Sequence, residues 1–411
     1  MPILHRTRTL SALMPRYVER FRCIGPSCED TCCAGWPVHI DKKTYKAYRN
    51  QTHPALQPLL ARMRRLDDAS DVRGYAILPT SGGDGACPAQ QDGLCSVHAT
   101  LGESYLNDTC QNYPRINRNV NGQQEQALSL SCIEAARMAL LAEDAFEFVE
   151  APISVREGTV HTTVVAGRIS PQLMNEARIF CMNLMRTREL ALWQRLAILG
   201  AFCEALERYL IGNAEQQAIQ TIIDDFIGVI ESGELVATLE LIQPDHASQA
   251  RVFATLWGVR GFTATSAFQQ NLMQRIATGL GGDANGQVSA AALEAAYLRG
   301  LQRLEAMLAS TPWLLENYLL NEMFANLFPV DGGNPYSVYL QLVARFGLLR
   351  LLLAAQCNAE DALPQLSTLT ATVALQCRRF QHDRDYTTQV NRSLRESGWA
   401  DLDKLYTLIR T

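Results

Sequence analysis

Lysine is nearly absent from this chain of 411 residues, which has only Lys42, Lys43, Lys46 and Lys404. The other basic residues are arginine, a bias that genomic base composition commonly produces. An excess of positive charge is also lacking, because the formal net charge is −5. Proteins that bind nucleic acid usually carry a basic surface, so we expect no nucleic-acid partner.

Long apolar segments are missing as well. Spanning a bilayer takes roughly 18–20 apolar residues, and the best candidate, Phe346–Ala355, is short and broken by Arg350. The first twenty residues contain no continuous apolar segment of the kind found in signal peptides. We therefore expect a cytoplasmic protein without a membrane partner, in a compartment where thiols stay reduced.

A glycine-rich loop between a strand and a helix, the usual sign of a nucleotide-binding domain, is not apparent. The segment Ser81–Gly85 precedes a cysteine, and Asp331–Tyr336 lies between expected helices, so both are interpreted as turns. No repeat of fixed period occurs. An ordinary doubly wound cofactor domain is therefore not expected.

The second part of the chain has the apolar spacing of helices. After the Ser170-Pro171 cap signal, apolar residues recur with helical period to Leu210. The same spacing predicts helices over Gln216–Glu231, His246–Leu280, Ser289–Ser310, Pro312–Leu327, Tyr336–Gln356, Glu360–Phe380 and Asp385–Ile409. We predict a mainly α protein, in which residues 151–411 form an all-α helical domain.

Residues 1–150 differ in character. Short helices are expected over Lys42–Asn50 and Leu56–Asp67, loops over Thr80–Pro88 and Asn117–Gln124, and a hairpin over Ile153–Val165 at the junction. Eight of the twelve cysteines fall in this segment: Cys23, Cys28, Cys32, Cys33, Cys87, Cys95, Cys110 and Cys132. We predict a small, cysteine-rich module that is organised by metal.

Three interpretations of these cysteines compete. A disulfide framework fits the even number but needs an oxidising compartment. Burial as small apolar side chains suits Cys181, Cys203, Cys357 and Cys377, which lie in apolar helices, but not eight cysteines among Gly, Pro, Asp and Asn. Metal binding fits best, because four thiolates complete a zinc site or a [4Fe–4S] cluster.

The spacing leaves the ligand set open. Eight thiols suffice for two sites, or for one site with spare thiols. Adjacent Cys32 and Cys33 are expected to point in different directions, so one of them would be structural or serve a second site. His39 and His98 lie near the cysteines and are further candidate ligands, although a single histidine is more often an ordinary polar residue.

The segment CPAQQDGLCSVHATLGESYLNDTCQNYP, Cys87–Pro114, resembles the second half of the CxxCxxCC cysteine-cluster family, which is thought to chelate zinc or iron. The longer spacing in FRCIGPSCEDTCCAGWPVHID, Phe21–Asp41, resembles the flagellin lysine-N-methylase branch. Two further segments, Glu316–Val330 and Tyr336–Ala354, are similar to helical parts of that branch. His98 departs from the pattern, which favours tyrosine there.

This resemblance implies a cytoplasmic enzyme that transfers methyl groups from S-adenosylmethionine to lysines of flagellin. It also implies an iron–sulfur cluster on the N-terminal cysteines, with zinc as the alternative. The scarcity of lysine suits such an enzyme, since it would offer few lysines of its own. From the residues alone, a non-catalytic metal-binding or redox-sensing module fused to a helical interaction domain is the alternative.

Methyl transfer to lysine requires loss of a proton, because an ammonium with a pKa of about 10.4 has no lone pair. Polar residues on the helix that follows Thr311 could provide this chemistry. We predict Glu316 or Glu322 as the base and Tyr318 as the group that orients the amine or the sulfonium, with Asn317 and Asn321 binding the cofactor. The alternative is a solvated stripe on an amphipathic helix.

Overall fold

A computed structural model describes residues 4–66, 74–80, 85–91, 93–163, 170–211, 217–258, 264, 266–283, 288–330, 334–380 and 384–410. Parts of the two glycine-rich turns predicted above, 81–84 and 331–333, lie outside the described residues. The chain divides into two compact units. The first comprises 1–138, 147–163 and 263–273, and the second comprises 139–146, 164–262 and 274–411.

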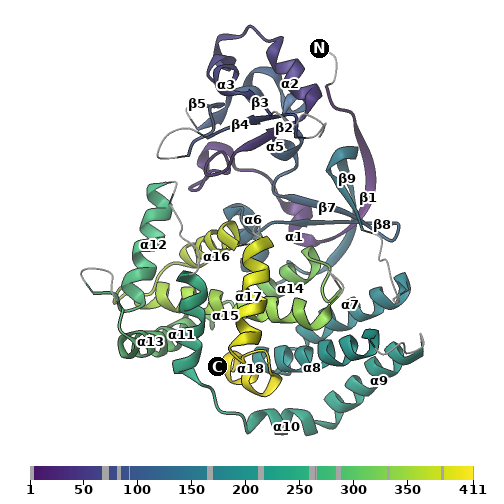
Figure 1. The fold of residues 1–411 in the computed structure, drawn as a ribbon, viewed down its shortest axis with the longest axis vertical. Coiled ribbons are helices and arrows are strands. Elements are labelled where there is room, and N and C mark those ends of the chain that lie inside the picture. The colour runs from purple at the N-terminus through teal and green to yellow at the C-terminus, as the bar shows by residue number, and fades with distance from the viewer. Residues whose placement is uncertain are drawn as a thin grey trace. The chain divides into compact units, whose positions relative to one another are not determined.

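The first unit is built on a mixed five-stranded sheet with the order β10-β7-β8-β1-β9 (Figure 1). Its strands are β1 (Thr7–Pro15), β7 (Arg115–Val120), β8 (Gln123–Leu128), β9 (Phe148–Arg156) and β10 (Val160–Thr163). Strand β1 pairs in parallel with β8 and antiparallel with β9, and β10 pairs in parallel with β7. This sheet was not predicted from the sequence.

Two local expectations in this unit are wrong. The segment Asn117–Gln124 is a hairpin of β7 and β8, in which Asn121 and Gly122 both take positive φ, of 51° and 94°. Asn-Gly is the preferred pair for such a two-residue turn. The described part of Ile153–Val165 is not a hairpin, because β9 and β10 lie at opposite edges of the sheet.

Smaller elements surround the cysteines. The structure has a three-stranded sheet and a two-stranded sheet, from β2 (Val38–Ile40), β3 (Arg64–Arg65), β4 (Ala76–Leu78), β5 (Gln90–Gln91) and β6 (Leu94–Cys95). The helices are α1 (Arg16–Arg20), α2 (Lys42–Arg49), α3 (Gln57–Arg62), α4 (Ser96–Leu101), α5 (Asp108–Asn112) and α6 (Ile133–Leu141). The helix expected at Lys42 is confirmed, and Asp41 caps it. The helix expected at Leu56 is shorter than predicted.

The second unit is helical in its described part, so the prediction of a mainly α protein is confirmed. Its helices are α7 (Pro171–Arg186), α8 (Leu192–Ile211), α9 (Gln217–Ser232), α10 (Glu234–Glu240), α11 (His246–Gly258), α13 (Ala290–Leu308), α14 (Leu314–Ala325), α15 (Pro335–Asn358), α16 (Leu366–Phe380), α17 (Arg384–Glu396) and α18 (Leu402–Ile409). Helix α12 (Ala267–Gly279) crosses the division between the units.

Several boundaries differ from the expected ones. The predicted His246–Leu280 and Asp385–Ile409 helices are each two helices, and α10 was not predicted. Ser170 caps α7 as expected, since its hydroxyl accepts a hydrogen bond from Leu173 N at 3.2 Å. The helix predicted over Pro312–Leu327 is shorter, because α14 begins after Trp313.

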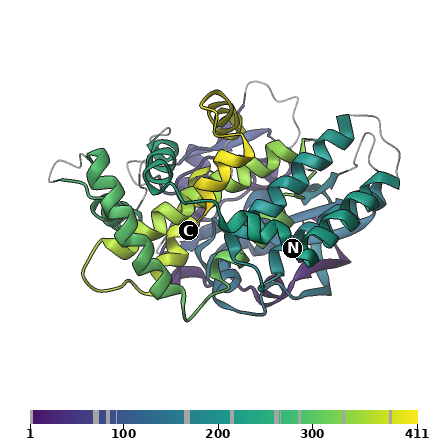
Figure 2. The same cartoon turned by 90° about the horizontal axis from the view of Figure 1, so that it is seen from below.

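Helix α15 is the central helix of the second unit and packs against α8, α11, α13, α16 and α17. The last helix, α18, lies among α8, α11 and α15 (Figure 2). By length and composition α15 could cross a membrane, yet 83 % of its most apolar window is buried inside the structure. Core helices of soluble proteins have the same property. Arg350, which interrupts the apolar sequence, donates hydrogen bonds to Leu408 O and Ile409 O, both at 2.7 Å.

Candidate functional site

The eight N-terminal cysteines lie in the first unit and form two electrostatically interacting groups. The first contains Cys33, Cys87, Cys95 and Cys110, and the second contains Cys23, Cys28 and Cys132. Cys32 interacts with members of both. Segments that are distant in the sequence therefore bring their thiols to one part of the fold, as the crowding of cysteines suggested.

Backbone hydrogen bonds build the first group. Cys87 N donates to Cys33 O at 2.8 Å, which joins the two halves of the cysteine pattern. Gln90 N donates to Cys87 O at 2.8 Å, and Gln90 pairs with Cys95 across the β5–β6 hairpin. The Cys33–Cys87 hydrogen bond and the short β5–β6 hairpin thus position the backbones of Cys33, Cys87 and Cys95.

Asn107 fixes the fourth thiol. Its Oδ1 accepts from Cys110 N at 3.0 Å and caps α5, while its Nδ2 donates to Cys110 Sγ at 3.2 Å. A donor aimed at the sulfur stabilises the thiolate over the thiol. Burial acts in the opposite sense and raises the pKa of Cys110 to about 12.

Cys32 and Cys33 interact strongly with each other, which raises the pKa of Cys32 and lowers the pKa of Cys33. The divergence of their side chains stays a prediction. His39 and His98 are both exposed. Neither belongs to a metal-binding group in the described residues.

The donor set has the chemistry of a soft metal site, but the coordination geometry is not formed. All twelve cysteines, each of which is described, are free thiols. Within the described part of the chain, no three His, Cys, Asp or Glu residues come close enough to hold a metal. Burial raises the pKa of Cys87 and of Cys132 to about 11, which disfavours thiolates unless a cation compensates them. Eight such thiols fit zinc or an iron–sulfur cluster.

The predicted catalytic residues lie on α14 in the second unit, where all five are buried, so α14 is not a helix with a solvated stripe. Glu316 accepts hydrogen bonds from Arg195 Nη1 at 2.7 Å and from Arg188 Nη2 at 3.0 Å. Glu322 Oε2 pairs with Arg345 Nη1 at 3.0 Å. Both carboxylates therefore already accept hydrogen bonds from arginine.

The remaining polar residues of α14, Asn317, Tyr318 and Asn321, are also buried inside the second unit. Asn317 Nδ2 donates to Ala139 O at 2.9 Å and to Ala142 O at 3.0 Å, and Asn321 is fully buried. Burial, and then the charge of Glu322, raise the pKa of Tyr318.

The cavity beside Glu322 is about 70 Å³, which holds water but falls below the roughly 300–1,000 Å³ of small-molecule sites. The catalytic and cofactor roles assigned to α14 stay predictions.

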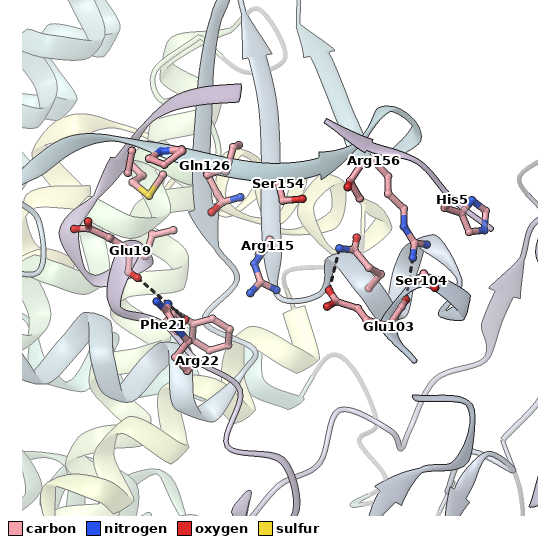
Figure 3. Close-up of a pocket in the computed structure, with 17 residues that line it drawn as sticks. His5, Glu19, Phe21, Arg22, Glu103, Ser104, Arg115, Gln126, Ser154 and Arg156 are labelled. Carbon is pink, nitrogen blue, oxygen red and sulfur yellow. Dashed lines mark hydrogen bonds between the residues drawn. The ribbon is translucent and has the colours of Figure 1, made fainter. Parts of the chain in front are cut away.

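A larger cavity, of about 570 Å³, lies in the first unit against the five-stranded sheet (Figure 3). Residues of five separate segments line it, and the segments are 5–22, 103–111, Arg115, Gln126 and 151–156. None of these residues was predicted as a site residue. Two of them are neighbours of cysteines in the sequence, Arg22 of Cys23 and Gln111 of Cys110.

Arg115 is the prominent charge of this cavity. Figure 3 shows it between the side formed by Phe21 and Arg22 and the side formed by Glu103. Its guanidinium carbon lies 5.5 Å from the centre of the Phe21 ring. Burial lowers the pKa of Arg115, and the charge of Glu103 opposes this. The cavity therefore has a cationic centre with an acidic edge.

Comparisons with known proteins give the family. A family model described as the FliB lysine N-methylase C-terminal domain matches residues 178–408. A protein named lysine-N-methylase from Salmonella typhimurium strain LT2 is 24 % identical over 398 residues, which cover 94 % of this chain and 96 % of that protein. The lysine-N-methylase of Salmonella choleraesuis matches to the same extent.

A third relative, the flagellar biosynthetic protein FliU of Salmonella muenchen, is 30 % identical over 145 residues, which cover 35 % of this chain and 85 % of that protein. No solved structure matches the chain.

The fold and the two sites define a mainly helical protein whose first unit carries a group of thiols and an arginine-centred cavity. Because the family model spans more than half of it, the chain belongs to the FliB lysine N-methylase family. The resemblance found in the sequence is thereby confirmed. The names of the relatives support methyl transfer to protein lysine as the general activity.

Proposed function

We propose that the protein is an S-adenosylmethionine-dependent lysine N-methyltransferase that acts on flagellin in the cytoplasm. The observation that carries this proposal is the match to two proteins named lysine-N-methylase along 94 % of the chain. The match to a flagellar biosynthetic protein favours a flagellar substrate. The sparsity of lysine in the chain agrees with both.

The reaction moves a methyl group from a sulfonium to an amine nitrogen. The lysine must first lose a proton, and the amine, the methyl carbon and the sulfur must then align for in-line displacement. The new N–C bond takes the amine lone pair, and the electrons of the broken S–C bond stay on sulfur. Desolvation of the ammonium lowers its pKa, so burial of the substrate lysine can replace a strong base.

The N-terminal thiols are proposed to hold an iron–sulfur cluster, with zinc as the alternative. The ligands would come from Cys33, Cys87, Cys95 and Cys110, of which Cys33 and Cys87 share a backbone hydrogen bond, and from Cys23, Cys28, Cys32 and Cys132 for a second site. When bound, the metal centre would supply positive charge that favours thiolates, so binding would contribute to folding of this unit. Asn107 would position Cys110 through its hydrogen bond to sulfur.

The test uses full-length protein purified without oxygen and assayed for iron, zinc and sulfide. It is incubated with S-adenosylmethionine and flagellin, and the lysine peptides are analysed by mass spectrometry. The proposal predicts methylated lysines that appear with time and require S-adenosylmethionine. Metal-loaded, folded protein that leaves flagellin unmodified would instead favour the metal-binding or redox-sensing alternative.

A further inference from the structure

The cavity in the first unit has a partly buried cation whose hydrogen-bond donors are unused among the described residues. Arg115 is partly buried, and its guanidinium makes no hydrogen bond or ion pair with any described residue. A charge removed from water without a partner is unfavourable. The usual partner of an arginine fork is a carboxylate or a phosphate, which it binds through two parallel hydrogen bonds. An anionic group of a ligand would therefore complete the environment of Arg115.

A second arginine, Arg156, lines this cavity. Arg156 is 3 % exposed, and its terminal nitrogens donate to Leu106 O at 2.7 Å, Glu103 O at 3.1 Å and Asp108 Oδ1 at 3.2 Å. Its Nε is buried and has no hydrogen-bond partner. Buried polar atoms in native proteins are seldom left without one. Because this Nε is closed off from solvent, a ligand in the cavity would meet Arg156 as a fixed positive charge and not through Nε.

The acidic residues of the cavity favour a ligand that carries a positive group as well as an anionic one. The Glu19 and Glu103 side chains are exposed at its edge, and neither forms an ion pair in the described structure. Both would repel phosphate or sulfate. A zwitterion instead places its carboxylate on Arg115 and its ammonium near a glutamate. This combination is the recognition pattern of an α-amino acid.

The cavity is larger than an amino acid requires. Its volume of about 570 Å³ leaves room for a neutral, polar group of the size of a nucleoside. Phe21 offers an aromatic ring, and Ser104 and Ser154 offer hydroxyl groups. Gln126 Nε2 donates to Asn117 Oδ1 at 2.6 Å, so its carbonyl oxygen is the atom left for a ligand.

We propose that this cavity binds S-adenosylmethionine, with Arg115 pairing to the carboxylate of its amino-acid part and Glu103 or Glu19 near the ammonium. The proposal rests on the function proposed above and assigns the methyl donor to the first unit rather than to Asn317 and Asn321. The cavity also neighbours the thiols, because Arg115 interacts electrostatically with Cys23 and Cys132.

The test measures ligand binding, independently of turnover, on the metal-loaded full chain by isothermal titration calorimetry. S-adenosylhomocysteine and 5′-methylthioadenosine share a neutral sulfur and the nucleoside, but only the first has the amino-acid part. Arg115→Gln should weaken binding of S-adenosylmethionine and S-adenosylhomocysteine about 10- to 100-fold, the loss expected for a charge-assisted hydrogen bond. Binding of 5′-methylthioadenosine should not change.

Two further variants keep the test decisive. Arg62→Gln removes an exposed arginine of the same unit that does not line the cavity, and all three affinities should be retained. Arg115→Lys keeps the charge but not the planar fork, so it should bind with intermediate affinity, and it serves if Arg115→Gln fails to fold. Melting temperature and metal content are checked for each variant.

The possible outcomes distinguish a wrong assignment of the cavity from a wrong proposed function. Unchanged affinities in folded Arg115→Gln, or an equal loss for all three ligands, would overturn the assignment of the cavity and leave the proposed function standing. Wild-type protein that is metal-loaded and binds no S-adenosylmethionine would overturn both. Selective loss for the two ligands with a carboxylate is the result that supports the assignment.

Discussion

Replacing Glu316 with glutamine tests whether this buried carboxylate stabilises the helical unit or acts in catalysis. The Glu316 side chain is 4 % exposed and lies against two arginines. The side chain of Arg195 is 8 % exposed, whereas that of Arg188 is 48 % exposed. The variant therefore leaves one buried cation without a counter-charge and one that water can solvate.

The expected cost follows from these two pairs. Removing one partner of a buried ion pair costs about 3–5 kcal/mol, and an exposed pair contributes at most about 1 kcal/mol. Because the amide oxygen of glutamine can still accept a hydrogen bond from Arg195, we expect a loss of about 2–4 kcal/mol in the free energy of unfolding. At about 2–4 °C per kcal/mol, the melting temperature should fall by about 5–15 °C.

The assay is thermal and urea unfolding followed by circular dichroism, with methylation measured well below the lower melting temperature. Glu305→Gln, at an exposed position of α13, is the matched control and should melt like the wild type. Adding Arg195→Met to Glu316→Gln should cost less than the sum of the single changes. A Glu316→Gln variant that melts like the wild type but cannot methylate would refute the structural role and support the base predicted from the sequence.

Three other predictions concern the core and the thiols. Arg350→Met should lower the free energy of unfolding by about 2–5 kcal/mol, since it leaves buried carbonyls of α18 without donors, and urea unfolding would show this. Gly300→Ala should cost about 1–3 kcal/mol or more, because a Cβ there overlaps the Ala354 carbonyl of α15; an unchanged melting temperature would contradict the close packing. Cys110→Ser should lose metal in an iron, zinc and sulfide assay, whereas Cys357→Ala, in the helical unit, should retain it.

The sequence predicted those parts of the fold in which one segment carries the signal. The cap at Ser170 and the long apolar periodicity of the second unit reproduce helices that the structure contains. The hairpin at Asn121-Gly122 also had its signal, and the polar composition around it obscured the strands. The five-stranded sheet had no local sequence signal, because β1 pairs with β9, which lies more than one hundred residues further along the chain.

The same distinction holds for the sites. Cysteine spacing alone indicated that thiols gather in the first unit, which the structure supports through the Cys33–Cys87 backbone bond. The partners of α14 could not be foreseen, since Arg195 is 121 positions from Glu316. The arginine-centred cavity was missed because tertiary folding assembles it from five segments, and no single segment shows a binding pattern.

Transfer of a labelled methyl group would show whether the protein methylates flagellin. Metal-loaded protein is incubated with flagellin and S-adenosylmethionine whose methyl group carries three deuterium atoms, and lysine peptides are sequenced by mass spectrometry. If the protein is the proposed methyltransferase, lysine side chains of flagellin will carry deuterated methyl groups, in an amount that rises with enzyme concentration. Flagellin lysines that stay free of the label, with metal content and folding intact, would contradict this function.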